Sequence, residues 1–93
     1  MAKRILMIDD DPEFVDAITN LLDAKGYNTD SASNGKDGFE KAKAAPPDMI
    51  LLDVMMTTKS EGFDTARKLH EEDSLKNIPV IMRTGVREKM NLH

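Results

Sequence analysis

A run of five residues, MILLD at positions 49–53, constrains the fold of this chain more than any other part of its sequence. Four consecutive apolar residues, bounded by prolines before and a polar stretch after, predict a short strand that is buried on both faces. Such a strand is typical of the centre of a parallel sheet, whose two faces are covered by helices. Ligands bind at the C-terminal edge of such sheets, so Asp53, at the end of the strand, is the first candidate for chemistry.

Two further apolar runs share this form and predict strands over residues 4–9 and 79–84. Asp9, Asp10 and Asp11 follow ILMI in the first run, and Thr84 follows PVIM and Arg83 in the second. Residues 27–32 are polar and alternate weakly, which is typical of an edge strand. Strands alternating with helices in units of about twenty residues predict a parallel sheet with right-handed crossovers.

The helices are predicted from caps and from apolar spacing. Asp11 and Pro12 begin the first helix and Gly26 ends it. Its apolar stripe, expected to face the sheet, comprises Phe14, Val15, Ile18, Leu21 and Leu22. A second helix over residues 36–45 turns Phe39 and Ala42 inward. After a loop over residues 54–61, a third helix over 62–72 has Phe63, Ala66 and Leu69 on its inner side, and residues 86–92 would start another.

Length and charge narrow the function classes. Ninety-three residues make one small domain. A net charge of -4 argues against a nucleic-acid or anionic-membrane surface, which needs a basic face. The chain has no cysteine for a disulfide or a thiolate metal site, and its N-terminal apolar run is too short for a signal peptide or a membrane span. We expect a cytoplasmic domain that binds neither membrane nor nucleic acid.

The predicted strand ends bring Asp9, Asp10, Asp53 and Thr84 to one edge of the sheet. Carboxylates crowded together repel one another unless a cation neutralises them. Oxygen ligands without histidine or cysteine favour magnesium over zinc. A hydroxyl beside such a site can hydrogen-bond a phosphoryl oxygen, so the residues suggest phosphate chemistry in which one aspartate is the nucleophile.

The segments ILMIDDDP, MILLDVMM and PVIMRTG, together with Gly62, resemble the receiver domain of two-component response regulators in both order and spacing. The resemblance extends from Arg4 to about Val86. It implies a flavodoxin-like, doubly wound parallel sheet with helices on both faces and strand order 2-1-3-4. The family's fifth strand and final helix would be missing, so we expect residues 1–93 to be an incomplete receiver-like domain from a longer chain.

The resemblance also implies a role for each site residue. Asp53 would take a phosphoryl group from the histidine of a histidine kinase or phosphotransfer protein, in a signalling module rather than an enzyme. Magnesium would be held by the side chains of Asp10 and Asp53 and by the backbone carbonyl of Met55. Asp9 would act on the metal mainly through water, and Thr84 would turn toward the phosphoryl oxygen.

The chain departs from the family pattern at several positions. Thr57 replaces a proline, Gly62 falls one residue late, and the lysine of the fifth strand is absent. Arg83 replaces an apolar residue, so if it points into a helix-covered face it must find a carboxylate or extend to solvent. The fourth strand would be an open apolar edge, through which two copies of the chain could pair.

Two other functions remain open from the residues. In a phosphatase of the haloacid dehalogenase type, Asp9 would be the nucleophile and Asp11 the acid/base, although Glu13 does not fit that motif. A non-phosphorylated interaction module would instead dock partners through the open edge. The aspartate that carries phosphate distinguishes these functions.

Overall fold

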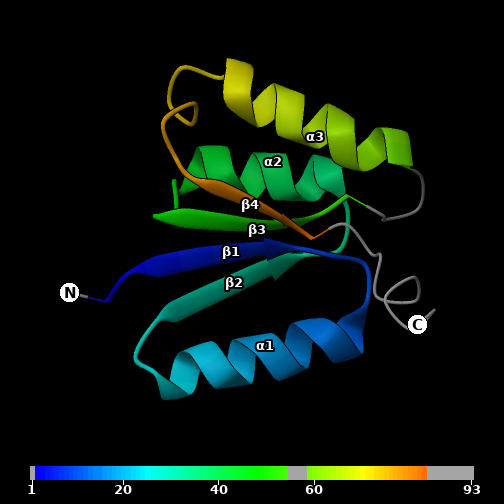
Figure 1. The fold of residues 1–93 in the computed structure, drawn as a ribbon. Coiled ribbons are helices and arrows are strands. Elements are labelled where there is room, and N and C mark those ends of the chain that lie inside the picture. Colours follow the sequence, from blue (N-terminus) through cyan, green and yellow to red (C-terminus); the bar gives the residue numbers. More distant parts are fainter. Residues whose placement is uncertain (1, 55–58, 84–93) are drawn as a thin grey trace, which may run out of the picture.

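The computed structural model describes residues 2–54 and 59–83, which form a four-stranded parallel sheet with three helices. The elements are β1 (Arg4–Ile8), α1 (Pro12–Ala24), β2 (Asn28–Ala32), α2 (Gly35–Ala44), β3 (Met49–Asp53), α3 (Lys59–Glu71) and β4 (Val80–Arg83). The strand order is β2-β1-β3-β4, as predicted. In Figure 1, α1 covers one face of the sheet, and α2 and α3 cover the other.

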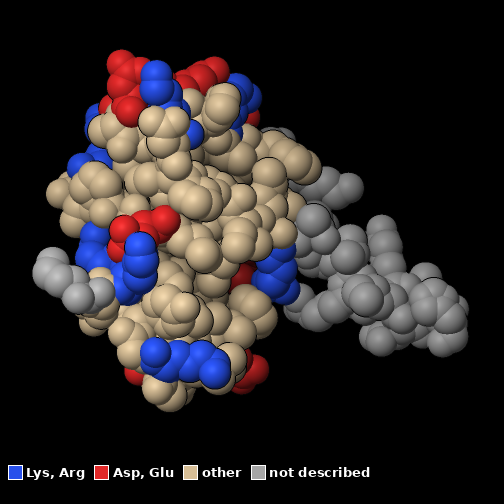
Figure 2. Space-filling model, turned by 60° about the vertical axis from the view of Figure 1, so that its left-hand side comes forward, with Lys and Arg blue, Asp and Glu red and all other residues tan. Residues whose placement is uncertain are grey.

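One face of the molecule carries its charged side chains in small, separate groups (Figure 2). Figure 2 shows one face on which small groups of Lys, Arg, Asp and Glu surround a broad area without charge. Two of the residues in β4 are large, apolar and exposed, Ile81 at 53% and Met82 at 44%. Among the described residues, β4 pairs with β3 alone, so the predicted open apolar edge is present there.

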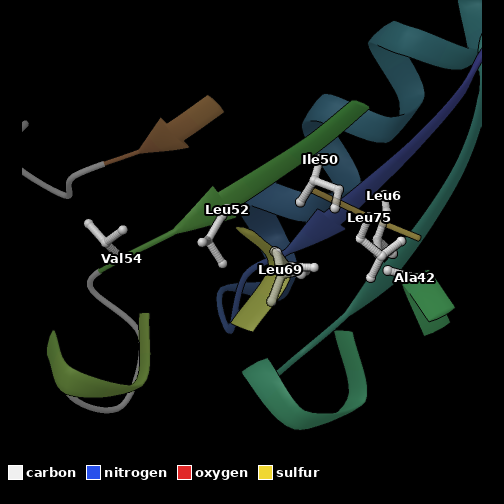
Figure 3. Packing of buried hydrophobic residues seen from close by; sticks show 8 residues of the cluster. Leu6, Ala42, Ile50, Leu52, Val54, Leu69 and Leu75 are labelled. Carbon is white, nitrogen blue, oxygen red and sulfur yellow. The ribbon is translucent and has the colours of Figure 1, made fainter. Parts of the chain in front are cut away.

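The hydrophobic core lies between the sheet and the layer formed by α2 and α3 (Figure 3). It is built from the continuous apolar runs of β1 and β3, which pair with each other in the centre of the sheet. Its buried members are Leu6, Ile8, Ala42, Ile50, Leu52, Val54, Leu69 and Leu75. The Met49–Asp53 run is therefore a central strand, as its sequence predicts.

Helix α1 begins as predicted, and one of its predicted core residues is exposed. Asp11 is the N-cap, and its Oδ1 accepts hydrogen bonds from the backbone N–H groups of Glu13 (3.1 Å) and Phe14 (3.3 Å). Gly26 follows the helix with φ +95°, a conformation that favours glycine. The prediction was wrong for Leu21, which is 53% exposed. This leucine lies at the margin of the stripe, beyond the reach of the sheet.

Helix α3 begins at Lys59, so the predicted loop over residues 54–61 is wrong for its last three positions. The inward face also differs from the prediction, since Phe63 is 55% exposed. Leu69 is buried and Ala66 packs against the core, as predicted, and the other buried positions described on α3 are Gly62 and Thr65. Thr65 can be buried because its hydroxyl donates a hydrogen bond to the backbone carbonyl of Glu61 (2.8 Å).

The other bounds of the strands and helices agree with the prediction or differ from it by one residue. The predicted end of the fourth strand, Thr84, lies outside the described residues. The predicted helix over residues 86–92 lies outside the described residues. In the part of the chain that the structure describes, no helix has the length and apolar character needed to cross a membrane.

Candidate functional site

Three carboxylates gather at the C-terminal edge of the sheet, as the sequence predicts. Asp9 and Asp10 directly follow β1, and Asp53 ends the adjacent strand β3. One carboxylate oxygen from each lies within 4.8 Å of the others. Asp9 and Asp53 are buried, with exposures of 4% and 3%, whereas Asp10 is exposed. The parallel register of β1 and β3 thus produces a small acidic site that opens to solvent at Asp10.

Both carboxylate oxygens of Asp9 have partners. Its Oδ1 accepts a hydrogen bond from the backbone N–H of Asp11 (2.9 Å), at the entrance to α1. Its Oδ2 accepts from Nε (3.2 Å) and Nη2 (3.0 Å) of Arg83, at the end of β4. Asp9 therefore connects the beginning of α1 to the last described strand.

Among the described residues, Arg83 brings a positive charge to the site. It lies opposite Asp53 in the β3–β4 register, and its Nη2 is 3.5 Å from Asp53 Oδ2. Its guanidinium carbon lies 4.0 Å from the centre of the Phe14 ring, a favourable cation–π arrangement. The sequence indicated that Arg83, if it faced a helix-covered side of the sheet, would have to find a carboxylate or extend to solvent, and the structure gives it Asp9 and Asp53 as partners. Sequence reasoning missed the aromatic contact, because nothing in the spacing links Phe14 to Arg83.

Asp11 has a structural role at the start of α1. Its side chain caps α1, and its backbone N–H is bonded to Asp9. An acid/base role for Asp11 in a dehalogenase-type motif is therefore not supported. Two other predicted site residues, Met55 and Thr84, lie outside the described residues.

The acidic site fits a hard divalent cation. Among the described residues, three carboxylates gather here, and the guanidinium of Arg83 pairs with two of them. All donors are oxygens, the ligand type that magnesium and calcium prefer. The burial of Asp9 and Asp53 strengthens the attraction, since their charges are less screened by water.

Comparison with known proteins agrees with this geometry. The family model described as "Response regulator receiver domain" matches residues 5–93. The DNA-binding dual master transcriptional regulator RpaA of Synechocystis sp. is 37% identical over 83 residues, which are 89% of this chain and 34% of RpaA. The chain thus spans about a third of the length of that relative, and 37% of a similar regulator, PhoP of Bacillus subtilis.

Solved structures give the same result. The N-terminal domain of a response regulator receiver protein from Methanoculleus marisnigri has a TM-score of 0.84 at 34% identity, covering 90% of this chain and 68% of that one. A complex of the histidine kinase ThkA with the response regulator TrrA matches with a TM-score of 0.78 at 28% identity, covering 89% and 69% of the two chains. From its strand order, its acidic site and these matches, the chain belongs to the receiver domains of two-component response regulators.

Proposed function

We propose that Asp53 is the phosphoacceptor of this receiver domain. The observation that carries the proposal is the burial of Asp53 at the end of β3, within 4.8 Å of carboxylate oxygens from Asp9 and Asp10. We further propose a phosphohistidine of a histidine kinase or phosphotransfer protein as the donor. The complex between ThkA and TrrA, a similar response regulator, supports a histidine kinase as the partner.

In the proposed reaction, a carboxylate oxygen of Asp53 forms a bond to phosphorus while the phosphorus–nitrogen bond of the phosphohistidine breaks. The electron pair of that bond goes to the imidazole nitrogen, and Asp53 becomes an acyl phosphate. Burial leaves the carboxylate of Asp53 with little solvation by water before transfer. Before a cation binds, Asp9 holds Arg83 beside Asp53 and fixes the start of α1.

Magnesium is the cofactor that we propose, held by the side chains of Asp10 and Asp53 and the backbone carbonyl of Met55, with Asp9 acting through water. When bound, such a cation neutralises negative charge on the phosphoryl oxygens. The oxygen-only donor set supports this choice. The roles of Met55 and of Thr84, as a hydrogen-bond donor to the phosphoryl group, remain predictions.

Intact-mass measurement tests the proposal. The chain is incubated with magnesium and acetyl phosphate, a small phosphodonor. We expect the wild type to gain the mass of one phosphoryl group and Asp53→Asn to gain none. Asp73→Asn is the matched control, because it removes a carboxylate whose side chain is 96% exposed. This variant should behave as the wild type. Phosphate on Asp9 instead would favour the phosphatase alternative, and no phosphate at all would favour a non-phosphorylated interaction module.

A second proposal concerns association of the chain. We propose that two copies associate through β4, because Ile81 and Met82 are exposed and β4 has a strand on one side only among the described residues. An unpaired strand edge offers backbone N–H and C=O groups to a second strand. The cytoplasmic location, the lack of nucleic-acid binding and the single incomplete domain over residues 1–93 stay predictions.

A further inference from the structure

We propose that Arg83 competes with the divalent cation for the acidic site and thereby sets its metal affinity. The inference concerns this chain's own arginine and depends on the metal site of the proposed function. It rests on the contacts of Arg83 with Asp53, which would hold the metal directly, and with Asp9, which would act on it through water.

The guanidinium and the metal would compete for the same space beside Asp9 and Asp53. Nη2 of Arg83 lies 3.0 Å from Asp9 Oδ2 and 3.5 Å from Asp53 Oδ2. The same two carboxylates and Asp10 each offer an oxygen within 4.8 Å of the others. A second cation brought into this space is repelled by the first, and it also has to share oxygens that already accept hydrogen bonds. Metal binding therefore requires Arg83 to weaken or give up its contacts with these carboxylates.

Arg83 is held firmly enough for this competition to matter. Two of its nitrogens donate to Asp9, and its guanidinium stacks on Phe14 at 4.0 Å. Arginine keeps its charge at any pH at which proteins fold, so the competition cannot be relieved by deprotonation. Movement of the side chain is the remaining way to relieve it.

The structure offers room for that movement. The Arg83 side chain is 26% exposed, and it borders a cavity of about 140 Å³ on the face of the sheet covered by α1. Apolar side chains make up most of this cavity's lining, among them Phe14, Ile18 and Ile81. The stem of Arg83 can pack against such a lining while its guanidinium turns away from Asp53.

The test measures metal affinity directly, without any phosphorylation. Mn²⁺ is titrated into the protein, free Mn²⁺ is followed by electron paramagnetic resonance, and Mg²⁺ is measured by its displacement of Mn²⁺. We expect Arg83→Met to tighten binding roughly tenfold at low salt, because it removes a positive charge a few ångströms from the metal. The gain should shrink as salt is added.

Matched variants separate competition from other effects. Arg67→Met removes the same charge from an exposed ion pair with Asp64 on α3, and it should leave the affinity within about twofold of the wild type. Arg83→Lys keeps a charge at the site and should stay closer to the wild type than Arg83→Met. Phe14→Leu removes the aromatic support and should tighten binding several-fold even if Arg83→Met fails to fold.

The outcomes distinguish the inference from the proposed function. Equal or weaker affinity in folded Arg83→Met, or in Phe14→Leu if the first variant is unfolded, overturns the competition while the metal site stands. If no protein, wild type included, binds Mn²⁺ or Mg²⁺, the metal site itself is refuted and the competition with it. Phosphorylation of Asp53 is measured separately by intact mass.

Discussion

At the scale of single residues, the closest approach between α3 and the sheet depends on Gly62. A Cβ added there would lie 2.6 Å from the carbonyl oxygen of Val54, the residue that follows Asp53. Gly38, on α2, also lies in a tight place, but a Cβ added there would meet the side chain of Ile8. A side chain can change its rotamer, whereas the backbone after β3 is fixed by the sheet.

We therefore predict that Gly62→Ala lowers the free energy of unfolding by about 3 kcal/mol and Gly38→Ala by about 1 kcal/mol. Both changes gain the same helix propensity, which offsets part of the cost in each. Urea denaturation of the two variants and the wild type measures the difference. Equal losses would show that the backbone of Val54 moves as readily as the side chain of Ile8.

At the scale of elements, the start of α1 depends on the cap by Asp11. We predict that Asp11→Ala costs about 1 kcal/mol of stability, because two backbone N–H groups lose their acceptor. Asp11→Asn keeps an acceptor oxygen and should lose much less. Thermal unfolding followed by circular dichroism measures both variants, and an equal loss in Asp11→Asn would assign the effect to charge rather than to capping.

The elements themselves were largely predictable from the sequence. Continuous apolar runs identified β1 and β3, and capping and stop residues identified α1. Helix α3 was predicted less well, because its buried stripe contains a glycine and a threonine instead of the most apolar residues. Gly62 is needed for close approach, and Thr65 satisfies its hydroxyl within the helix. Such a stripe has no hydrophobic period, so Phe63 was wrongly placed inside.

The position of the three carboxylates was predictable because it follows from the predicted strands. Each carboxylate follows an apolar run, so the topology brings Asp9, Asp10 and Asp53 together without any information on side chains. The partner of Arg83 could not be predicted in this way. The partner depends on which side chains of β4 face α1 and on how far the long side chain of Arg83 extends. Neither can be read from the spacing of residues in the sequence.

At the scale of the whole molecule, the edge of β4 that no other described strand covers predicts self-association. In sedimentation velocity we expect the average mass to rise with concentration, and Ile81→Lys to suppress the rise by placing a charge on the edge. Leu21→Lys is a close control, because Leu21 on α1 and Ile81 are each 53% exposed. A wild type that stays monomeric at high concentration, or equal suppression by the two lysine variants, would contradict association through β4.

The hydrogen bonds that the two carboxylate oxygens of Asp9 accept have a further consequence for the molecule. Its carboxylate fixes the amide of Asp11 on one side and the side chain of Arg83 on the other, and the backbone carbonyl of Arg83 accepts from the amide of Val54 (2.9 Å). An event that draws Asp9 away releases both attachments together. Hydrogen exchange at the amide of Asp11, which then loses its acceptor, should therefore accelerate, and this would report on the state of the acidic site without an attached probe.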